Sequence, residues 1–109
     1  KWGFSRRQLD EFSASSHEKA ARATKEGLFD NELAPIAGLS TDEIIRPGTT
    51  VETLASLKPA FFGEAYASRF PQTTWEITPG NSSPLSDGSA AVMITSGKAA
   101  RELGLRPLE

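Results

Sequence analysis

The chain has 109 residues, of which 38% are hydrophobic and 24% charged, and its formal net charge is −2. This length suits one domain, and the near balance of charge excludes the strongly basic surface with which proteins bind nucleic acid or anionic membranes. The sequence contains no cysteine, so disulfides, thiolate metal sites and a cysteine nucleophile are excluded for these residues.

The sequence also gives no reason to expect a membrane partner. No apolar run approaches the about 20 residues that a membrane-spanning helix needs, and the first residues lack the pattern of a signal peptide. We therefore expect a cytoplasmic protein.

The first predicted element is a helix over residues 5–26. Ser5 and Gln8 have the spacing of a capping box, and Gly27 is placed to end the helix in a left-handed conformation. Residues 1–3 look like the end of an earlier helix, so we expect that the chain begins within a domain. Spacings of three and four residues predict a buried stripe formed by Leu9, Phe12, Ser16, Ala20 and Ala23.

The middle of the chain carries weaker signals. Residues 32–36 form a short apolar stretch that Pro35 would confine to an edge strand or an extended loop. Thr49 and Glu52 repeat the capping-box spacing and predict a second helix, which the proline after Lys58 would end. Within the aromatic segment that follows, a short helix is expected over residues 64–69.

The last third begins with a loop, residues 78–88, that is rich in Gly, Pro, Asn and Ser. The apolar run 90–94 lacks alternation and predicts a strand covered on both faces, as in a layered α/β sheet. Such a sheet needs more strands than this chain offers. Ser96 is placed to cap a final short helix that Gly104 would end, and we expect the domain to continue past it.

Several ionisable residues are candidates for catalytic or metal-binding groups. His17 is the only histidine and has no second metal ligand one turn away, which favours a surface residue over a base or a ligand. The acid pairs Asp10-Glu11 and Asp42-Glu43 consist of neighbours whose side chains point in different directions, which favours solvated faces. The sequence thus predicts no metal site and no catalytic residue.

Two features could bind a ligand. The guanidinium of Arg46, just before a predicted helix, could stack on a flat ring or bind phosphate, or could simply be solvated. In the loop, Gly80 and the hydroxyls of Ser82 and Ser83 could let a narrow ligand lie along the main chain. Turns before a strand would explain the same loop residues, so local chemistry leaves both interpretations open.

Three segments carry a more specific signal: SRRQLDEFSASSHEKAARATKEGLFDNELAPI, IIRPGTTVETLASLKPAF and TPGNSSPLSDGSAAVMITSGKAARELGL. Together they resemble the thiolase family, the acetyl-CoA acetyltransferases and 3-ketoacyl-CoA thiolases, over nearly the whole chain and in the family's order. The resemblance implies a piece of a layered αβα fold. Residues 1–78 would form the later part of the loop domain that covers coenzyme A. Residues 79–109 would form the tunnel loop, a buried core strand and the following helix of the N-terminal half.

The resemblance also implies a coenzyme A site. Ser83 would hydrogen-bond the pantetheine arm, while Pro79, Gly80 and Leu85 would line the tunnel that carries the thioester. Pro79 stands where alanine is common in relatives.

The same resemblance implies three residues near the nucleotide. The guanidinium of Arg46 would lie on the adenine ring, Thr53 would be a small polar neighbour, and Phe61 would form an apolar wall. Thr53 stands where some relatives have serine, and Pro84 where many have glycine, which would stiffen the tunnel wall and leaves the acyl group open.

Thiolases transfer an acyl group between 3-ketoacyl-CoA and coenzyme A through a cysteine thioester. By resemblance, the nucleophilic cysteine would precede residue 1, and the other catalytic residues would follow residue 109. We therefore expect a thiolase as the parent protein, a dimer or tetramer that uses coenzyme A as substrate and no further cofactor, and no activity from these 109 residues alone. Alternatives are a stand-alone coenzyme A or nucleotide-binding module and a non-catalytic lipid carrier or scaffold related to thiolases.

Overall fold

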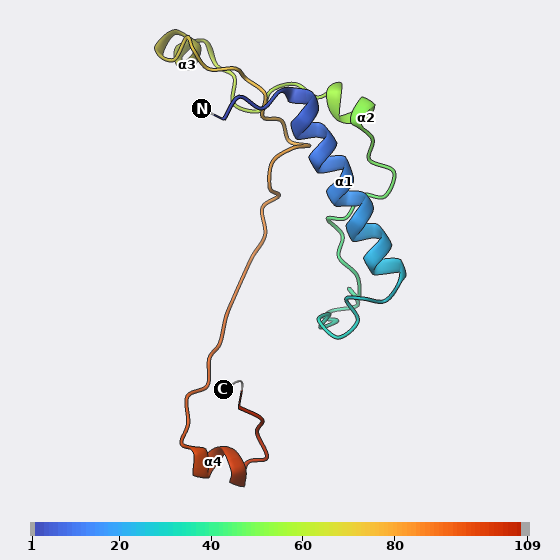
Figure 1. Cartoon of the computed structure of the whole chain (residues 1–109), viewed down its shortest axis with the longest axis vertical. Helices are drawn as coiled ribbons and strands as arrows, with labels where there is room; N and C mark the ends of the chain where they lie inside the picture. The colour runs from blue at the N-terminus through green and yellow to red at the C-terminus, as the bar shows by residue number, and fades with distance from the viewer. Residues whose placement is uncertain (1, 108–109) are drawn as a thin grey trace.

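The computed structural model of the chain describes residues 2–107. Within this range there are four helices, α1 (Arg6–Lys25), α2 (Val51–Ala55), α3 (Glu64–Arg69) and α4 (Gly97–Glu102). The short helix α2 lies beside α1, whereas α4 lies apart from both at the far end of a long extended segment (Figure 1). The molecule is accordingly elongated, with extents of 63, 34 and 27 Å along its principal axes.

Helix α1 confirms the predicted capping box and its predicted end. The Gln8 backbone N–H donates to Ser5 Oγ at 3.3 Å, and the Ser5 N–H donates to Gln8 Oε1 at 2.9 Å. At the other end Gly27 has a left-handed φ of 70°, and the Leu28 N–H donates to the Ala23 carbonyl at 3.0 Å. The observed helix therefore begins and ends one residue inside the predicted bounds.

Helix α2 begins one residue later than predicted. Its capping box is formed by Thr50 and Thr53, and the proposed pairing of Thr49 with Glu52 was wrong. The reason is that the Thr49 hydroxyl is already bonded to the Arg46 carbonyl at 2.8 Å. The Thr49 N–H donates to the same carbonyl at 3.3 Å and closes a turn in which Gly48 has a φ of 81°.

The two remaining helices confirm their predictions. Helix α3 spans the predicted residues, and α4 is capped by Ser96, whose Oγ accepts the Ala99 N–H at 3.2 Å. Gly104 ends α4 with a φ of 63°. At the other end of the chain Gly3 also has a left-handed φ of 70°, whereas Lys1, part of the predicted earlier helix, lies outside the described residues.

The predicted strands are not formed. Within residues 2–107 no β-strand is present, and the segment 90–94 is extended with Val92 86% and Ile94 92% exposed. A strand is stable only when a neighbour pairs with its backbone, and the described chain supplies none. The predicted α/β sheet is therefore absent here. Of the two alternatives for residues 32–36, the edge strand is not formed, and the stretch is a loop in which Ile36 bridges to Leu39 across a tight turn.

The core is small and partly polar. Among the described residues the buried side chains are Leu54, Ala100, Asp10 and Thr78. The predicted stripe of α1 was wrong for Phe12, which is 78% exposed, and for Ser16, which is exposed as well. Its other members are half-buried, and the most deeply buried side chain of α1 is Asp10. No helix in the described part of the chain is long and apolar enough to cross a membrane.

Candidate coenzyme A site

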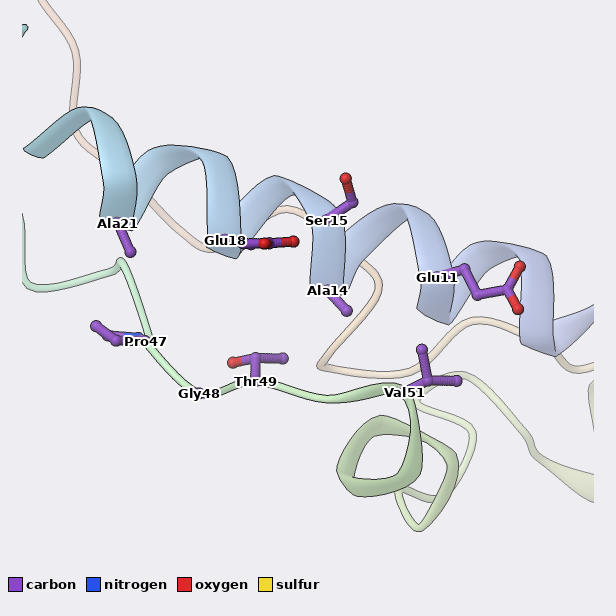
Figure 2. Close-up of a pocket in the computed structure, with 9 residues that line it drawn as sticks. All are labelled: Glu11, Ala14, Ser15, Glu18, Ala21, Pro47, Gly48, Thr49 and Val51. Atoms are coloured by element: carbon purple, nitrogen blue, oxygen red, sulfur yellow. The ribbon is translucent and has the colours of Figure 1, made fainter.

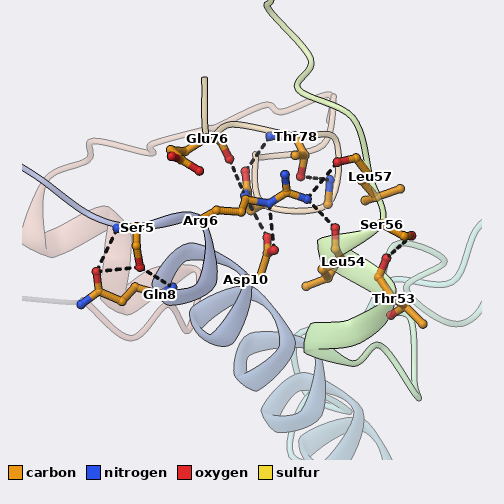
Figure 3. Close-up of polar contacts among 12 residues, drawn as sticks. Ser5, Arg6, Gln8, Asp10, Thr53, Leu54, Ser56, Leu57, Glu76 and Thr78 are labelled. Carbon is orange, nitrogen blue, oxygen red and sulfur yellow. Dashed lines mark hydrogen bonds and ion pairs between the residues drawn. The ribbon is translucent and has the colours of Figure 1, made fainter. Parts of the chain in front are cut away.

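A buried ion pair joins α1 to the end of α2 (Figure 3). Arg6 Nε lies 2.8 Å from Asp10 Oδ2, one turn along α1. Arg6 Nη2 also donates to the carbonyls of Leu54 at 2.5 Å and Leu57 at 3.0 Å. These carbonyls lie at the C-terminal end of α2, where a cation is favoured. The single guanidinium therefore holds two helices together.

The same carboxylate holds the loop that precedes the proposed tunnel. Asn81 Nδ2 donates to Asp10 Oδ1 and to the Glu76 carbonyl, both at 3.0 Å. Asn81 Oδ1 in turn accepts the Thr78 N–H at 2.8 Å. We name the set of Arg6, Asp10, Thr78 and Asn81 the polar anchor. The prediction that Asp10 lies on a solvated face was wrong, because Asp10 is fully buried. Its partner Asn81 is 71 residues away in the sequence.

Gly80 lies directly over α2. A Cβ added at this position would lie 2.5 Å from Leu54 Cδ2 and 2.6 Å from Leu57 Cδ1. A side chain at this position would therefore force the ends of the Leu54 and Leu57 side chains to move, and glycine lets the loop pack closely on them. Gly80 N–H also donates to the hydroxyl of Thr78 at 3.2 Å, which tightens the turn.

A groove of about 360 Å³ lies between α1 and this loop. Two of the seven predicted coenzyme A residues, Gly80 and Ser83, line it together with His17. The Ser83 hydroxyl is exposed and donates only to the neighbouring Pro84 carbonyl at 3.2 Å. The other lining residues are Phe12, Ser13, Ser16, Ala20, Ile44, Ile45, Asn81, Ser82 and Pro84.

Arg46 follows directly after the two isoleucines of this groove. Its backbone N–H donates to His17 Nδ1 at 3.2 Å, so the predicted surface residue His17 is half-buried and makes a specific contact. The guanidinium of Arg46 is exposed and has no hydrogen bond or ion pair within residues 2–107. It is thus available to a ligand from solvent.

The other four predicted residues do not line this groove. The Thr53 hydroxyl belongs to the cap of α2, where it accepts the Thr50 N–H at 3.1 Å and donates to the Thr50 carbonyl at 2.8 Å. Phe61 is 64% exposed, and Leu85 is fully exposed on the extended segment. Pro79 is exposed beside Gly80.

A second groove of about 430 Å³ lies on the other side of the turn before α2 (Figure 2). It contains none of the seven predicted residues. Its carboxylates are Glu11, which is paired with Arg7 at 2.8 Å, and Glu18 on the exposed face of α1. The other lining residues supply only the hydroxyls of Ser15 and Thr49, with no histidine, lysine or cysteine in the lining to activate them, so we assign this groove no chemistry.

One carboxylate near this turn has a shifted pKa. The pKa of Glu52 is lowered by a hydrogen bond from its own backbone N–H and then by the Thr50 hydroxyl, with a smaller contribution from the charge of Arg7. Glu52 lies in the first turn of α2, where free N–H groups favour a negative charge. The shift therefore reflects helix capping.

Comparisons with known proteins identify the family of the chain. The family model described as Thiolase, N-terminal domain matches residues 1–98, and the chain therefore belongs to the thiolase family.

Among curated proteins, 3-ketoacyl-CoA thiolase of Klebsiella pneumoniae is 45% identical over 114 residues. The 3-ketoacyl-CoA thiolases of Escherichia coli O1:K1 and Enterobacter sp. strain 638 are each 44% identical over 114 residues. Each of these alignments covers 96% of this chain and 27% of the relative. The chain thus spans about a quarter of the length of these relatives.

Proposed function

We propose that this chain is the coenzyme A-binding part of a thiolase that transfers an acyl group between 3-ketoacyl-CoA and coenzyme A. The observation that carries the proposal is the groove in which Gly80 and Ser83 face α1, with the unpaired guanidinium of Arg46 directly after its wall. The family membership and the names of the relatives support the same substrate class.

The groove suits the pantetheine arm of coenzyme A. That arm is narrow and carries two amides, and the exposed Ser83 hydroxyl can donate to or accept from an amide. Gly80 keeps the loop close to α2. Pro79 and Leu85 are apolar and exposed to solvent, so both side chains are free to contact an entering ligand.

The Arg46 side chain is suited to bind the nucleotide end of coenzyme A. An exposed guanidinium can stack on adenine, an interaction of about 0.5–2 kcal/mol depending on its shielding from water. Phe61 is exposed and can supply an apolar wall. Thr53 already uses its hydroxyl in the cap of α2, so its part at the site would be to hold the start of this helix in place.

The extended segment 90–94 is consistent with a fold that includes further strands. Its unpaired backbone and exposed apolar side chains suit a strand of a layered αβα sheet whose other strands lie elsewhere in the protein. The catalytic residues would lie outside this chain as well, because it contains no cysteine. A dimeric or tetrameric assembly and a cytoplasmic location complete the proposal.

The test is coenzyme A binding and thiolysis by the protein as it is naturally expressed, compared with Arg46→Ala, Ser83→Ala and the control Arg22→Ala. Arg22 is an exposed arginine in the last turn of α1 and lies outside the groove. We expect about a fivefold to tenfold loss of affinity for Arg46→Ala and for Ser83→Ala, as one stacking contact or hydrogen bond implies, and no loss for the control.

The outcomes separate the candidates. Absence of coenzyme A binding by the wild-type protein, or equal behaviour of all three variants, would refute the proposed site. Binding without thiolysis would favour the non-catalytic relative of thiolases. The 109-residue chain by itself should show no thiolysis.

A further inference from the structure

We propose that His17 is a positioning residue for Arg46. The imidazole holds the Arg46 main chain against α1. The guanidinium of Arg46 then lies at a fixed position beside the groove, where the adenine of coenzyme A can stack on it. The inference rests on the proposed function of Arg46, and it assigns to His17 no proton transfer.

The main chain of Arg46 is held on both sides. Its N–H donates to His17 Nδ1 at 3.2 Å, and its carbonyl accepts from the Thr49 hydroxyl at 2.8 Å and the Thr49 N–H at 3.3 Å. Between these residues Pro47 restricts its own φ, and Gly48 adopts a φ of 81°. The side chain of Arg46 therefore projects from a fixed backbone while its guanidinium stays unpaired.

Within residues 2–107, His17 is the one residue of α1 that is hydrogen-bonded to the segment 34–49. In residues 34–49 the other hydrogen bonds are local, such as the Ile44 N–H to Asp42 Oδ1 at 2.8 Å. Loss of the imidazole acceptor would leave the turn of Arg46 intact but would release it from the helix. The position of the guanidinium relative to Ser83 would then vary.

The contact requires an acceptor at one place on α1. Nδ1 accepts a hydrogen bond only when it carries no proton, which assigns the neutral tautomer with the proton on Nε2. The side-chain oxygen of asparagine can occupy the place of Nδ1, whereas leucine offers similar bulk and no acceptor. The pair His17→Asn and His17→Leu therefore separates hydrogen bonding from packing.

The expected loss of affinity for coenzyme A depends on the fraction of molecules in which Arg46 is held in its binding position. When only a fraction of molecules holds Arg46 in place, the apparent affinity falls by that fraction. The loss of one hydrogen bond changes such a population by about threefold to tenfold. The loss should fall mainly on the adenine end, because Asn81, two residues before Ser83, is held by its own hydrogen bonds to Asp10 and Thr78.

The experiment compares the dissociation constants of coenzyme A and of 4′-phosphopantetheine, which lacks adenosine, by calorimetry on the naturally expressed protein. The variants are His17→Leu, His17→Asn, Arg46→Ala and the double variant His17→Leu/Arg46→Ala. We expect His17→Leu to weaken coenzyme A about threefold to tenfold more than it weakens phosphopantetheine. His17→Asn should retain wild-type affinity, and the double variant should equal Arg46→Ala.

Three results would overturn the inference. One is an unchanged affinity of His17→Leu when Arg46→Ala weakens binding. Another is an equal loss for both ligands, which would indicate general disruption of the fold. The third is additive losses in the double variant. If instead Arg46→Ala binds coenzyme A as the wild type does, the proposed role of Arg46 fails, and the inference about His17 fails with it.

Discussion

Replacing Asp10 with alanine should loosen the contact among α1, α2 and the loop before Ser83. Removal of one partner from a buried ion pair costs about 3–5 kcal/mol when the other charge is left uncompensated. Here Arg6 keeps two carbonyl partners and its side chain is 21% exposed, and Asn81 keeps the Glu76 carbonyl. We therefore expect a smaller cost, about 2–3 kcal/mol, in the free energy of local unfolding.

Native-state hydrogen exchange measures this cost at individual amides. The N–H groups of Thr78 and Asn81 are hydrogen-bonded within the loop, and that of Leu54 within α2. A loss of 2–3 kcal/mol corresponds to about a 30-fold to 150-fold drop in their protection.

The control for this prediction is Glu11→Ala, which removes the neighbouring acid of the same helix. Glu11 and its partner Arg7 are 48% and 76% exposed, and such surface pairs are worth about 0–1 kcal/mol. If Asp10→Ala lowers protection no more than Glu11→Ala does, the polar anchor does not hold these three segments together.

Two further changes test the loop and the start of α2. Gly80→Ala should cost about 1–3 kcal/mol by overpacking against Leu54 and Leu57 and lower the urea midpoint, and an unchanged midpoint would contradict the close approach. Because the folded-state pKa of Glu52 is below its ordinary 4.5, its stabilisation is fully present above pH 4.5 and is lost as the pH falls through the lowered value. Glu52→Gln should remove this part of the pH dependence in urea titrations, and an identical pH profile would contradict it.

The helix ends were predictable because their causes are local. Ser5 and its partner Gln8 are three residues apart, and the glycines that end α1 and α4 act on the preceding turn. Where the prediction failed at α2, the competing cause was also local but unrecognised, since the hydroxyl of Thr49 was used by the turn at Arg46.

The polar anchor was not predictable from sequence. Asp10 looked like half of a solvated acid pair because nothing near it in sequence supplies Asn81. The strand predicted at 90–94 is not formed because the described residues supply no neighbouring strand. The groove was predictable in part. The small size of Gly80 and the hydroxyl of Ser83 indicated a loop that could bind a ligand, but only the resemblance to thiolases indicated coenzyme A as that ligand. The contact of His17 with Arg46 spans 29 residues and left no pattern in the sequence.

The polar anchor has a consequence for how Ser83 is positioned. Apolar contacts leave neighbouring positions of a loop similar in energy, whereas hydrogen bonds at 2.8–3.0 Å fix both the distance and the direction of each group. The Asn81 side chain makes three hydrogen bonds, to the Thr78 N–H, to Asp10 and to the Glu76 carbonyl. Because Asn81 lies two residues before Ser83, these bonds fix the position of the loop relative to α1. In the proposed coenzyme A site, this order of the loop before binding would increase the affinity for the flexible pantetheine arm. The buried charge at Asp10 thus orders the loop before Ser83 as well as joining that loop to α1.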